Sequence, residues 1–309
     1  LNLPTSLLSI SKRTFSRCSG LVGSLIIPNS VTTIGDRAFY GCWSLNGDLW
    51  IPDSVMSIGD GAFKECYNIK SLKMSEKINS ISSNLFLDCI NIKGTIKIPY
   101  QVNTIGDKSF YNCSSISSLV MNSYIDSIGD RTFSFCSQLS GTLIIPSSVK
   151  SIGDYTFEGC SKYTKLIISK SMISIGRGAF MGCSGFTGSL ELPENISSIG
   201  RGAFCCCSGF NESLIIKEKL TSISDSLFEN CSNFKFNLPI PKYVISIGDR
   251  SFFGCKSFTS IGDFPQTVLS IGEEAFCGCS SLKFFLHFEK NIEKIGKNAF
   301  SGCKMLEGE

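Results

Sequence analysis

The stretch Val31-Thr32-Thr33-Ile34-Gly35-Asp36-Arg37-Ala38-Phe39-Tyr40-Gly41-Cys42 recurs along the whole chain of 309 residues. Every copy has a phenylalanine three positions before its cysteine and an isoleucine eight positions before it. Because fixed apolar positions return with a period in the twenties, the pattern predicts a solenoid of stacked coils. The copies follow in steps of 23 or 24 residues, with their cysteines at Cys18, Cys42, Cys66, Cys89, Cys113, Cys136, Cys160, Cys183, Cys207, Cys231, Cys255, Cys279 and Cys303.

The coil that contains this stretch begins with a predicted strand. Leu25-Ile26-Ile27 is short and apolar, and Pro28 after it donates no ladder hydrogen bond, so we expect the strand to end there. Alternation along a strand places Leu25 and Ile27 inside the coil and Ile26 outside. One outward side chain per coil is therefore predicted at the middle of each strand.

The rest of the coil is predicted to turn the chain back toward the next strand. We expect Gly35 to supply a permissive turn and Asp36 to cap a short helical turn over residues 37–42. Phe39 and Cys42 then face inward. One coil cannot bury its apolar side alone, so stacking should turn each position into a column. We therefore expect a right-handed leucine-rich-repeat coil, with a parallel β-sheet on its concave side and short helical turns or loops on its convex side.

The length and the net charge of the chain limit its domain organisation and the classes of partner it can bind. Since a solenoid grows by adding coils, we predict one domain over residues 1–309 of about thirteen units. Both ends fall inside a repeat and lack polar caps, which suggests a fragment of a longer array. The net charge of +3 is nearly neutral and the basic residues form no runs, so nucleic acid is not expected as a partner. No apolar stretch approaches the roughly 20 residues that span a bilayer, and no membrane insertion is expected within this chain.

The consensus L-x-I-P-x-S-V-x-x-I-G-D-x-A-F-x-G-C-x-x-L resembles the BspA-like leucine-rich repeat, also called the Treponema pallidum class, over essentially the full chain. The resemblance implies a protein at the cell surface or secreted, which adheres to host cells or matrix proteins. Fold alone does not establish such a function. Departures include Ile81-Ser82-Ser83 and Ile223-Ser224-Asp225, which lack the glycine, and Arg177, Arg201 and Lys297, which replace the aspartate. We expect them to weaken individual turns or caps.

The sixteen cysteines raise the question of disulfides or metal. Stacked columns bring Cα atoms to ~4.8 Å, within the disulfide range, but parallel side chains do not converge. The repeat cysteines are therefore interpreted as buried free thiols acting as small hydrophobes. Of the three others, Cys205 and Cys277 lie three coils apart, and a zinc site from Cys205-Cys206-Cys207 would need side chains that we expect the fold to point in different directions. No metal site and no cofactor are predicted.

Other chemistry-bearing residues also have simple structural explanations. The single histidine, His287, is expected outside the coil, away from the cysteine columns, so a cysteine–histidine catalytic pair is not predicted. The row of aspartates that includes Asp36 and Asp60 could suggest calcium, but capping explains it more simply. The sequence therefore predicts a protein that is not an enzyme.

The outward position of each strand is the candidate binding site. Mostly polar residues are expected there in a solvated sheet, and apolar ones suggest a contact surface. Strand propensity of β-branched residues is the other explanation. A protein ligand held by this concave stripe is the favoured function, with an intracellular scaffold in the cytoplasm as the alternative, since free cysteines suit reducing compartments. The predicted binding residues are Ile26, Trp50, Lys73, Lys97, Val120, Ile144, Ile167, Glu191, Ile215 and His287.

Overall fold

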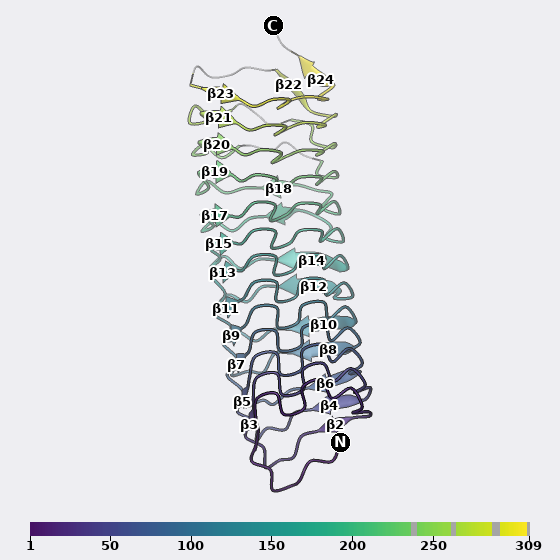
Figure 1. Ribbon diagram of the computed structural model, residues 1–309. Coiled ribbons are helices and arrows are strands. Elements are labelled where there is room, and N and C mark those ends of the chain that lie inside the picture. The colour runs from purple at the N-terminus through teal and green to yellow at the C-terminus, as the bar shows by residue number, and fades with distance from the viewer. Residues whose placement is uncertain (236–239, 261–263, 286–290, 308–309) are drawn as a thin grey trace. The chain divides into compact units, whose positions relative to one another are not determined.

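The computed structural model describes residues 1–235, 240–260, 264–285 and 291–307. The chain divides into two compact units, Leu1–Gly141 and Thr142–Glu309. The regular structure of each unit is short parallel β-strand, and none of the described residues is helical. Within each unit the coils stack one upon another (Figure 1), which confirms the predicted leucine-rich-repeat solenoid. One continuous domain over residues 1–309 stays a prediction.

One set of strands ends at the repeat isoleucine and forms the Ser–Ile ladder. Each strand is two residues long and pairs in parallel with the next, so that Ile10, Ile34 and Ile58 lie in register. Its strands are β1 (Ser9–Ile10), β3 (Thr33–Ile34), β5 (Ser57–Ile58), β7 (Ser80–Ile81), β9 (Thr104–Ile105) and β11 (Ser127–Ile128) in the first unit, and β13 (Ser151–Ile152), β15 (Ser174–Ile175), β17 (Ser198–Ile199), β19 (Ser222–Ile223), β20 (Ser246–Ile247), β21 (Ser270–Ile271) and β23 (Lys294–Ile295) in the second.

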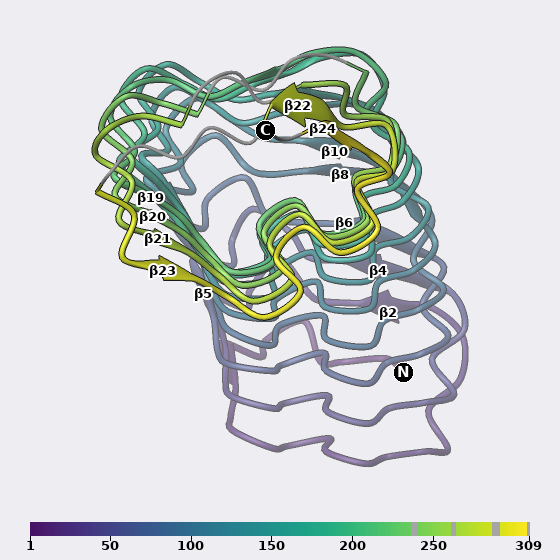
Figure 2. The ribbon, with the colours of Figure 1, turned by 90° about the horizontal axis from the view of Figure 1, so that it is seen from above.

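The other set is the predicted strand of each coil, and it forms the Leu-x-Ile ladder. Figure 2 shows that the two ladders occupy different sides of the coil in each unit. The strands are β2 (Leu25–Ile26), β4 (Asp48–Trp50), β6 (Ser71–Lys73), β8 (Gly94–Lys97) and β10 (Ile116–Val120) in the first unit, β12 (Gly141–Ile144) at the unit boundary, and β14 (Tyr163–Ile167), β16 (Leu190–Glu191), β18 (Leu214–Ile215), β22 (Lys283–Phe285) and β24 (Met305–Glu307) in the second.

The core between the ladders is built from the predicted columns. In the first unit the Phe86 ring stacks between Phe63 and Phe110, with centroids 5.7 and 5.4 Å away. The repeat cysteines are free and, apart from half-buried Cys18 and Cys303, they are buried. Burying one such phenylalanine stabilises the fold by about 1.5–3 kcal/mol, so the phenylalanine column is a main source of stability.

The cysteine column does more than fill space. The thiol of Cys66 donates a hydrogen bond to the carbonyl oxygen of Phe39 in the preceding coil at 3.1 Å, and the same contact recurs along both units. Burial raises the pKa of these thiols, to about 12 at Cys136. The repeat cysteine is therefore a protonated donor between coils, a role that the sequence analysis did not predict.

The predicted helical turn is replaced by alternating hydrogen bonds. The amides of Arg37 and Phe39 donate to the carbonyl oxygens of Asp60 and Ala62 in the next coil at 2.9 and 2.8 Å. The amide between them, that of Ala38, closes a turn within its own coil. Arg37 has a φ of 52°, a left-handed conformation that interrupts a helix. The expected cap is therefore wrong as well: the Asp36 carboxylate accepts a hydrogen bond from the Asp60 amide of the next coil at 3.2 Å.

The repeat glycine after the isoleucine is needed for close stacking. A turn does begin at Gly59, whose carbonyl oxygen accepts from the Ala62 amide at 3.3 Å, but its φ is not left-handed, so the turn itself does not require glycine. A Cβ atom on Gly59 would lie 2.4 Å from the backbone nitrogen of Asp36 in the preceding coil, closer than real contacts allow. The Gly59 amide donates to the Ile34 carbonyl oxygen at 2.7 Å. Glycine therefore lets neighbouring backbones approach to hydrogen-bonding distance.

The Ser–Ile ladder is interrupted where this glycine is missing. In the first unit β5 and β7 belong to different sheets, and in the second unit so do β17 and β19. At these points Ser82 and Ser224 replace the glycine, and their hydroxyl groups donate to the carbonyl oxygens of Ile58 and Ile199. A side chain here displaces the backbone bond, so these two departures interrupt the ladder. The turn that begins at Ser224 is still closed by the Leu227 amide at 3.2 Å, so the expected weakening of turns or caps stays a prediction.

Candidate functional site

The outward side chains of the first unit form an exposed row on the Leu-x-Ile ladder. Parallel register places Ile26, Trp50 and Lys73 beside one another on β2, β4 and β6. Ile26 is 62% exposed and Trp50 51%. Lys97 and Val120 are paired in the same way on β8 and β10. The predicted outward orientation of all five is confirmed.

Trp50 is held in a defined position by its neighbour. The ammonium group of Lys73 lies 4.4 Å from the centroid of the Trp50 ring, a cation–π contact. The next coil therefore presents a charged group against one face of the indole and leaves half of the residue in solvent. An exposed tryptophan with restricted motion is a suitable binding residue, since less conformational entropy is lost when a partner covers it.

The second unit presents a row of the same kind. Ile144 is 57% exposed, and Ile167, Glu191 and Ile215 are also exposed on β14, β16 and β18. Glu191 and Ile215 are in register, and the carboxylate of Glu191 forms an ion pair with Lys217 at 3.0 Å. Their outward orientation is likewise confirmed, while a binding role for any of them stays a prediction. His287 lies outside the described residues.

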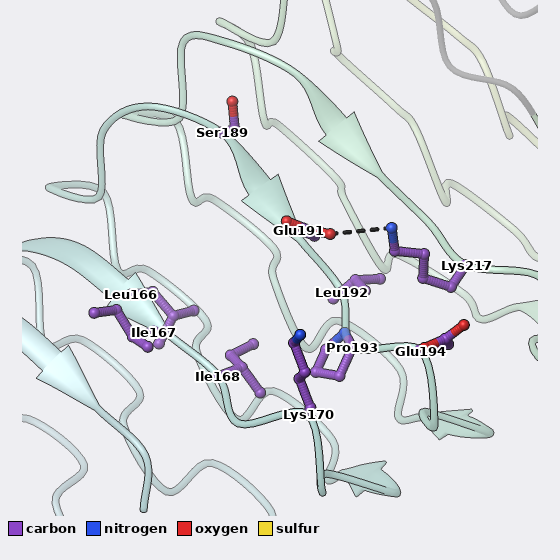
Figure 3. A pocket seen from close by; sticks show the side chains of 10 residues that line it. All are labelled: Leu166, Ile167, Ile168, Lys170, Ser189, Glu191, Leu192, Pro193, Glu194 and Lys217. Atoms are coloured by element: carbon purple, nitrogen blue, oxygen red, sulfur yellow. Dashed lines mark ion pairs between the residues drawn. The ribbon is translucent and has the colours of Figure 1, made fainter.

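A cleft of about 400 Å³ opens in this row between β14 and β16. Figure 3 shows Lys170 between Ile168 and Pro193, with the Glu191–Lys217 pair on the other side of the cleft. No ion pair involves the Lys170 ammonium within the described part of the chain. The lining residues are Leu166, Ile167, Ile168, Lys170, Ser189, Glu191, Leu192, Pro193, Glu194 and Lys217.

The cleft exists because the ladder loses its register. Thr187 still donates to the Thr164 carbonyl oxygen at 2.9 Å, but the second coil then has one residue more, with Gly188 at a φ of 82°. After this insertion β14 and β16 belong to different sheets. The extra glycine therefore does not preserve the strand register here.

Two backbone groups at the cleft lack the bond that the coils on either side form. In the preceding coil the Ile145 amide donates to the Ile167 carbonyl oxygen at 3.0 Å, and in the following one Leu192 donates to Ile215 at the same distance. The equivalent pair, Ile168 N–H and Glu191 C=O, forms no such bond in the described residues. The cleft thus offers a backbone donor and a backbone acceptor next to apolar side chains.

Sequence reasoning missed a second group of exposed apolar side chains on the Ser–Ile ladder. Met56 in the first unit and Ile173, Ile245 and Leu269 in the second are exposed at the position just before the ladder serine. Leu269 donates its amide to the Ile245 carbonyl oxygen at 2.8 Å, so these two side chains are on neighbouring coils. A comparison of this position across all repeats would have found them.

The described residues hold no cluster of three or more histidine, cysteine, aspartate or glutamate side chains that could bind a metal ion. Among them, too, no helix is long and apolar enough to cross a membrane.

The row of aspartates makes contacts between coils. The carboxylate of Asp107 accepts a hydrogen bond from the Asp130 amide at 2.9 Å, as the carboxylate of Asp36 does from the Asp60 amide.

Comparison with known proteins places the whole chain in one group. A family model described as the BspA type leucine rich repeat region, in six copies, matches residues 1–117, 103–235 and 209–308. No curated protein matches the chain.

Solved structures share the fold along nearly the whole chain. A leucine-rich repeat protein from Bacteroides ovatus is 28% identical with a TM-score of 0.67, over 98% of this chain and 70% of that one. A leucine rich cell surface protein from Faecalibacterium prausnitzii is 25% identical with a TM-score of 0.59, over 96% of this chain and 86% of that one. A leucine-rich repeat protein from Eubacterium ventriosum is 19% identical with a TM-score of 0.60, over 93% of this chain and 90% of that one, and shows the fold alone.

Proposed function

This chain belongs to the BspA-type leucine-rich-repeat family, and on that premise we propose that it is a cell-surface adhesion module that binds a protein of the host-cell surface or extracellular matrix. The observation that carries the proposal is the exposed row on the Leu-x-Ile ladder, with Trp50 beside Ile26 in one unit and the cleft beside Ile167 in the other. Apolar groups of this kind at a solvent-facing sheet are typical of contact surfaces.

The cleft indicates how a partner is held in the second unit. An extended peptide segment offers both a carbonyl acceptor and an N–H donor at regular intervals, which match Ile168 N–H and Glu191 C=O. An apolar side chain of the same segment fits against Ile167 and Pro193, and an acidic one pairs with Lys170. We infer a partner segment in which apolar and acidic residues alternate.

Binding to immobilised matrix proteins and to cell monolayers, measured for single variants, tests the proposed face. Trp50→Ala and Ile144→Lys should each weaken binding by about 2 kcal/mol, roughly thirtyfold in Kd, if these residues are hot spots. Met56→Ala and Ile173→Lys change apolar residues of similar exposure on the Ser–Ile ladder and serve as controls. Circular dichroism and thermal unfolding check that all four variants remain folded.

The control variants also decide which ladder binds. If Met56→Ala or Ile173→Lys abolishes binding while Trp50→Ala and Ile144→Lys leave it unchanged, the partner contacts the Ser–Ile ladder and the proposed face is wrong. If folded wild-type protein binds none of the surfaces, the adhesion function itself fails. Antibody labelling of intact and permeabilised cells tests the proposed location separately.

A second candidate function is an intracellular scaffold for protein–protein interaction. The observation that favours it is that all sixteen cysteines are free, which is unusual in an oxidising compartment. The hydrogen bonds from column thiols to phenylalanine carbonyl groups reduce the weight of this argument, since they hold the thiols in place in either compartment. Labelling only after permeabilisation would favour the scaffold.

A further inference from the structure

Cys205 and Cys206 are two of the three cysteines that do not belong to the repeat column. Their sulfur atoms lie 3.6 Å apart. Cys205 is 6% exposed, whereas Cys206 is half-buried and reachable from solvent. Cys207, the next residue, belongs to the column and donates to the Phe180 carbonyl oxygen at 3.0 Å, so its thiol faces the core.

The repeat backbone is what brings the two sulfur atoms together. Cys206 has a φ of 61°, at a turn position where other coils have a glycine, such as Gly182 at 73° and Gly278 at 77°. Its amide donates to the Glu229 carbonyl oxygen of the next coil at 2.7 Å, which holds this conformation. The side chain of Cys206 is therefore directed back toward Cys205 by a turn that every coil shares.

We propose that Cys205 and Cys206 form a vicinal dithiol site, which a peroxide oxidises to a disulfide between the two residues. This inference is independent of the proposed adhesion function. The site would make the surface of the second unit sensitive to oxidants at one defined turn.

The reaction balances with one peroxide molecule. The Cys206 thiolate attacks a peroxide oxygen, so that an S–O bond forms, the O–O bond breaks and hydroxide leaves. The Cys205 thiol then attacks the Cys206 sulfur, so that the S–S bond forms and the oxygen leaves as water with the remaining proton. Two thiols lose two electrons and hydrogen peroxide becomes two molecules of water.

The order of the steps follows from burial. Burial raises the pKa of the Cys205 thiol, and the adjacent Cys206 raises it further. The more accessible Cys206 is therefore the thiol that reacts with the oxidant, and the Cys205 thiol then displaces the oxygen. A zinc ion is a poorer occupant, because structural zinc requires four ligands and no cluster of three candidate ligands occurs in the described chain.

The disulfide should be easy to reduce. Consecutive Cα atoms are about 3.8 Å apart, below the usual range of roughly 4.4–6.8 Å for bridged cysteines. Strained disulfides have higher reduction potentials and are the labile ones. Millimolar glutathione should therefore regenerate both thiols.

Peroxide treatment followed by alkylation, trypsin and mass spectrometry tests the proposal. Peptide 202–217 contains Cys205, Cys206 and Cys207, and should lose two hydrogens while keeping one alkylated cysteine, with fragment ions that place the bond between Cys205 and Cys206. Peptide 257–283 is the matched control. There Cys277 occupies the same turn position as Cys205 but is followed by Gly278, and no internal disulfide should form.

The variant Cys206→Gly should remain folded, because the preceding coil has a glycine, Gly182, at this position with a similar φ. It should form no disulfide at any peroxide concentration, with an unchanged circular dichroism spectrum. Phenylarsine oxide gives an independent readout, since it condenses with two adjacent thiols and releases water. The wild-type protein should bind one equivalent and Cys206→Gly none.

Three results would overturn the proposal. The first is a bond that joins Cys207 to either neighbour. The second is sulfinic acid at Cys206 with Cys205 still open to alkylation. The third is equal binding of phenylarsine oxide by the wild-type protein and Cys206→Gly.

Discussion

Each unit has two ladders, and they are interrupted in opposite ways. On the Ser–Ile side, β5 and β7 separate where Ser82 adds a side chain at the glycine position. On the Leu-x-Ile side, β14 and β16 separate where Gly188 adds a whole residue. The extra side chain is accommodated by a hydroxyl hydrogen bond to Ile58, whereas the extra residue opens a cleft.

A solenoid can acquire a binding site where one coil has an extra residue. An extra side chain displaces one hydrogen bond and replaces it locally. An extra residue instead shifts the register, so a backbone donor and acceptor and the flanking side chains become available to a partner. Other glycines at the start of the predicted strand, including Gly94 and Gly141, lie on the same ladder, so it is on this ladder that the number of residues per coil varies.

The largest expected effect is on the core that both ladders share. Phe86→Ala should lower the free energy of unfolding of the protein by about 3–5 kcal/mol, because stacked coils cannot collapse onto the cavity. Chemical denaturation measures the loss, and hydrogen exchange should show that β7 and β8 lose protection together. A loss confined to one ladder would contradict the idea of a common core.

The next largest loss of stability is expected at two kinds of glycine, one that permits close stacking of coils and one with a left-handed φ. Gly59→Ala should cost about 1–3 kcal/mol, since its Cβ atom would overlap the Asp36 backbone. Gly94→Ala meets no atom within 4 Å but has a φ of 86°, and should cost about 1–2 kcal/mol through backbone strain alone.

A backbone readout distinguishes these causes. Hydrogen exchange at the Ser–Ile ladder should accelerate in Gly59→Ala and remain unchanged in Gly94→Ala. If both variants change the exchange of the same amides, the glycines do not have separate roles.

A smaller effect is expected in the wild-type protein, on the hydrogen exchange of one backbone amide. The Ile168 amide lacks the ladder bond that Ile145 makes to Ile167, so it should exchange its hydrogen at least about tenfold faster. Residue-resolved hydrogen exchange of the wild-type protein measures both amides in one experiment. Equal protection would mean that β14 and β16 are paired in solution and that the cleft is closed.

The smallest effect is expected from repair of the Ser–Ile ladder. Ser82→Gly should restore a backbone bond worth about 0.5–1.5 kcal/mol, while the flexibility of glycine costs about 0.5–1 kcal/mol. The net change in unfolding free energy should thus stay within about 1 kcal/mol of zero, but the amide of residue 82 should become protected from exchange. A large destabilisation would show that the serine hydroxyl bond matters more than the ladder.

Much of this architecture could be predicted from single positions. The inward alternation of Leu25 and Ile27, the phenylalanine column and the outward row with Trp50 all follow from the two-residue period of a strand and the repeat length. The second strand of each coil was missed because two residues give no visible alternation. The roles of Gly35, Asp36 and Cys42 were misassigned or incomplete because each acts on a neighbouring coil.

The coil, its period and the side chains that face inward could be predicted from residue order alone, since these depend on distances along one chain. The atoms that come into contact become visible only in the folded coils: the glycine that permits contact, the thiol that bonds to a phenylalanine carbonyl group, the cleft beside Ile167 and the adjacent sulfur atoms of Cys205 and Cys206. These contacts join residues 23 to 27 positions apart or depend on a turn held by the next coil, and no local pattern in the sequence specifies them.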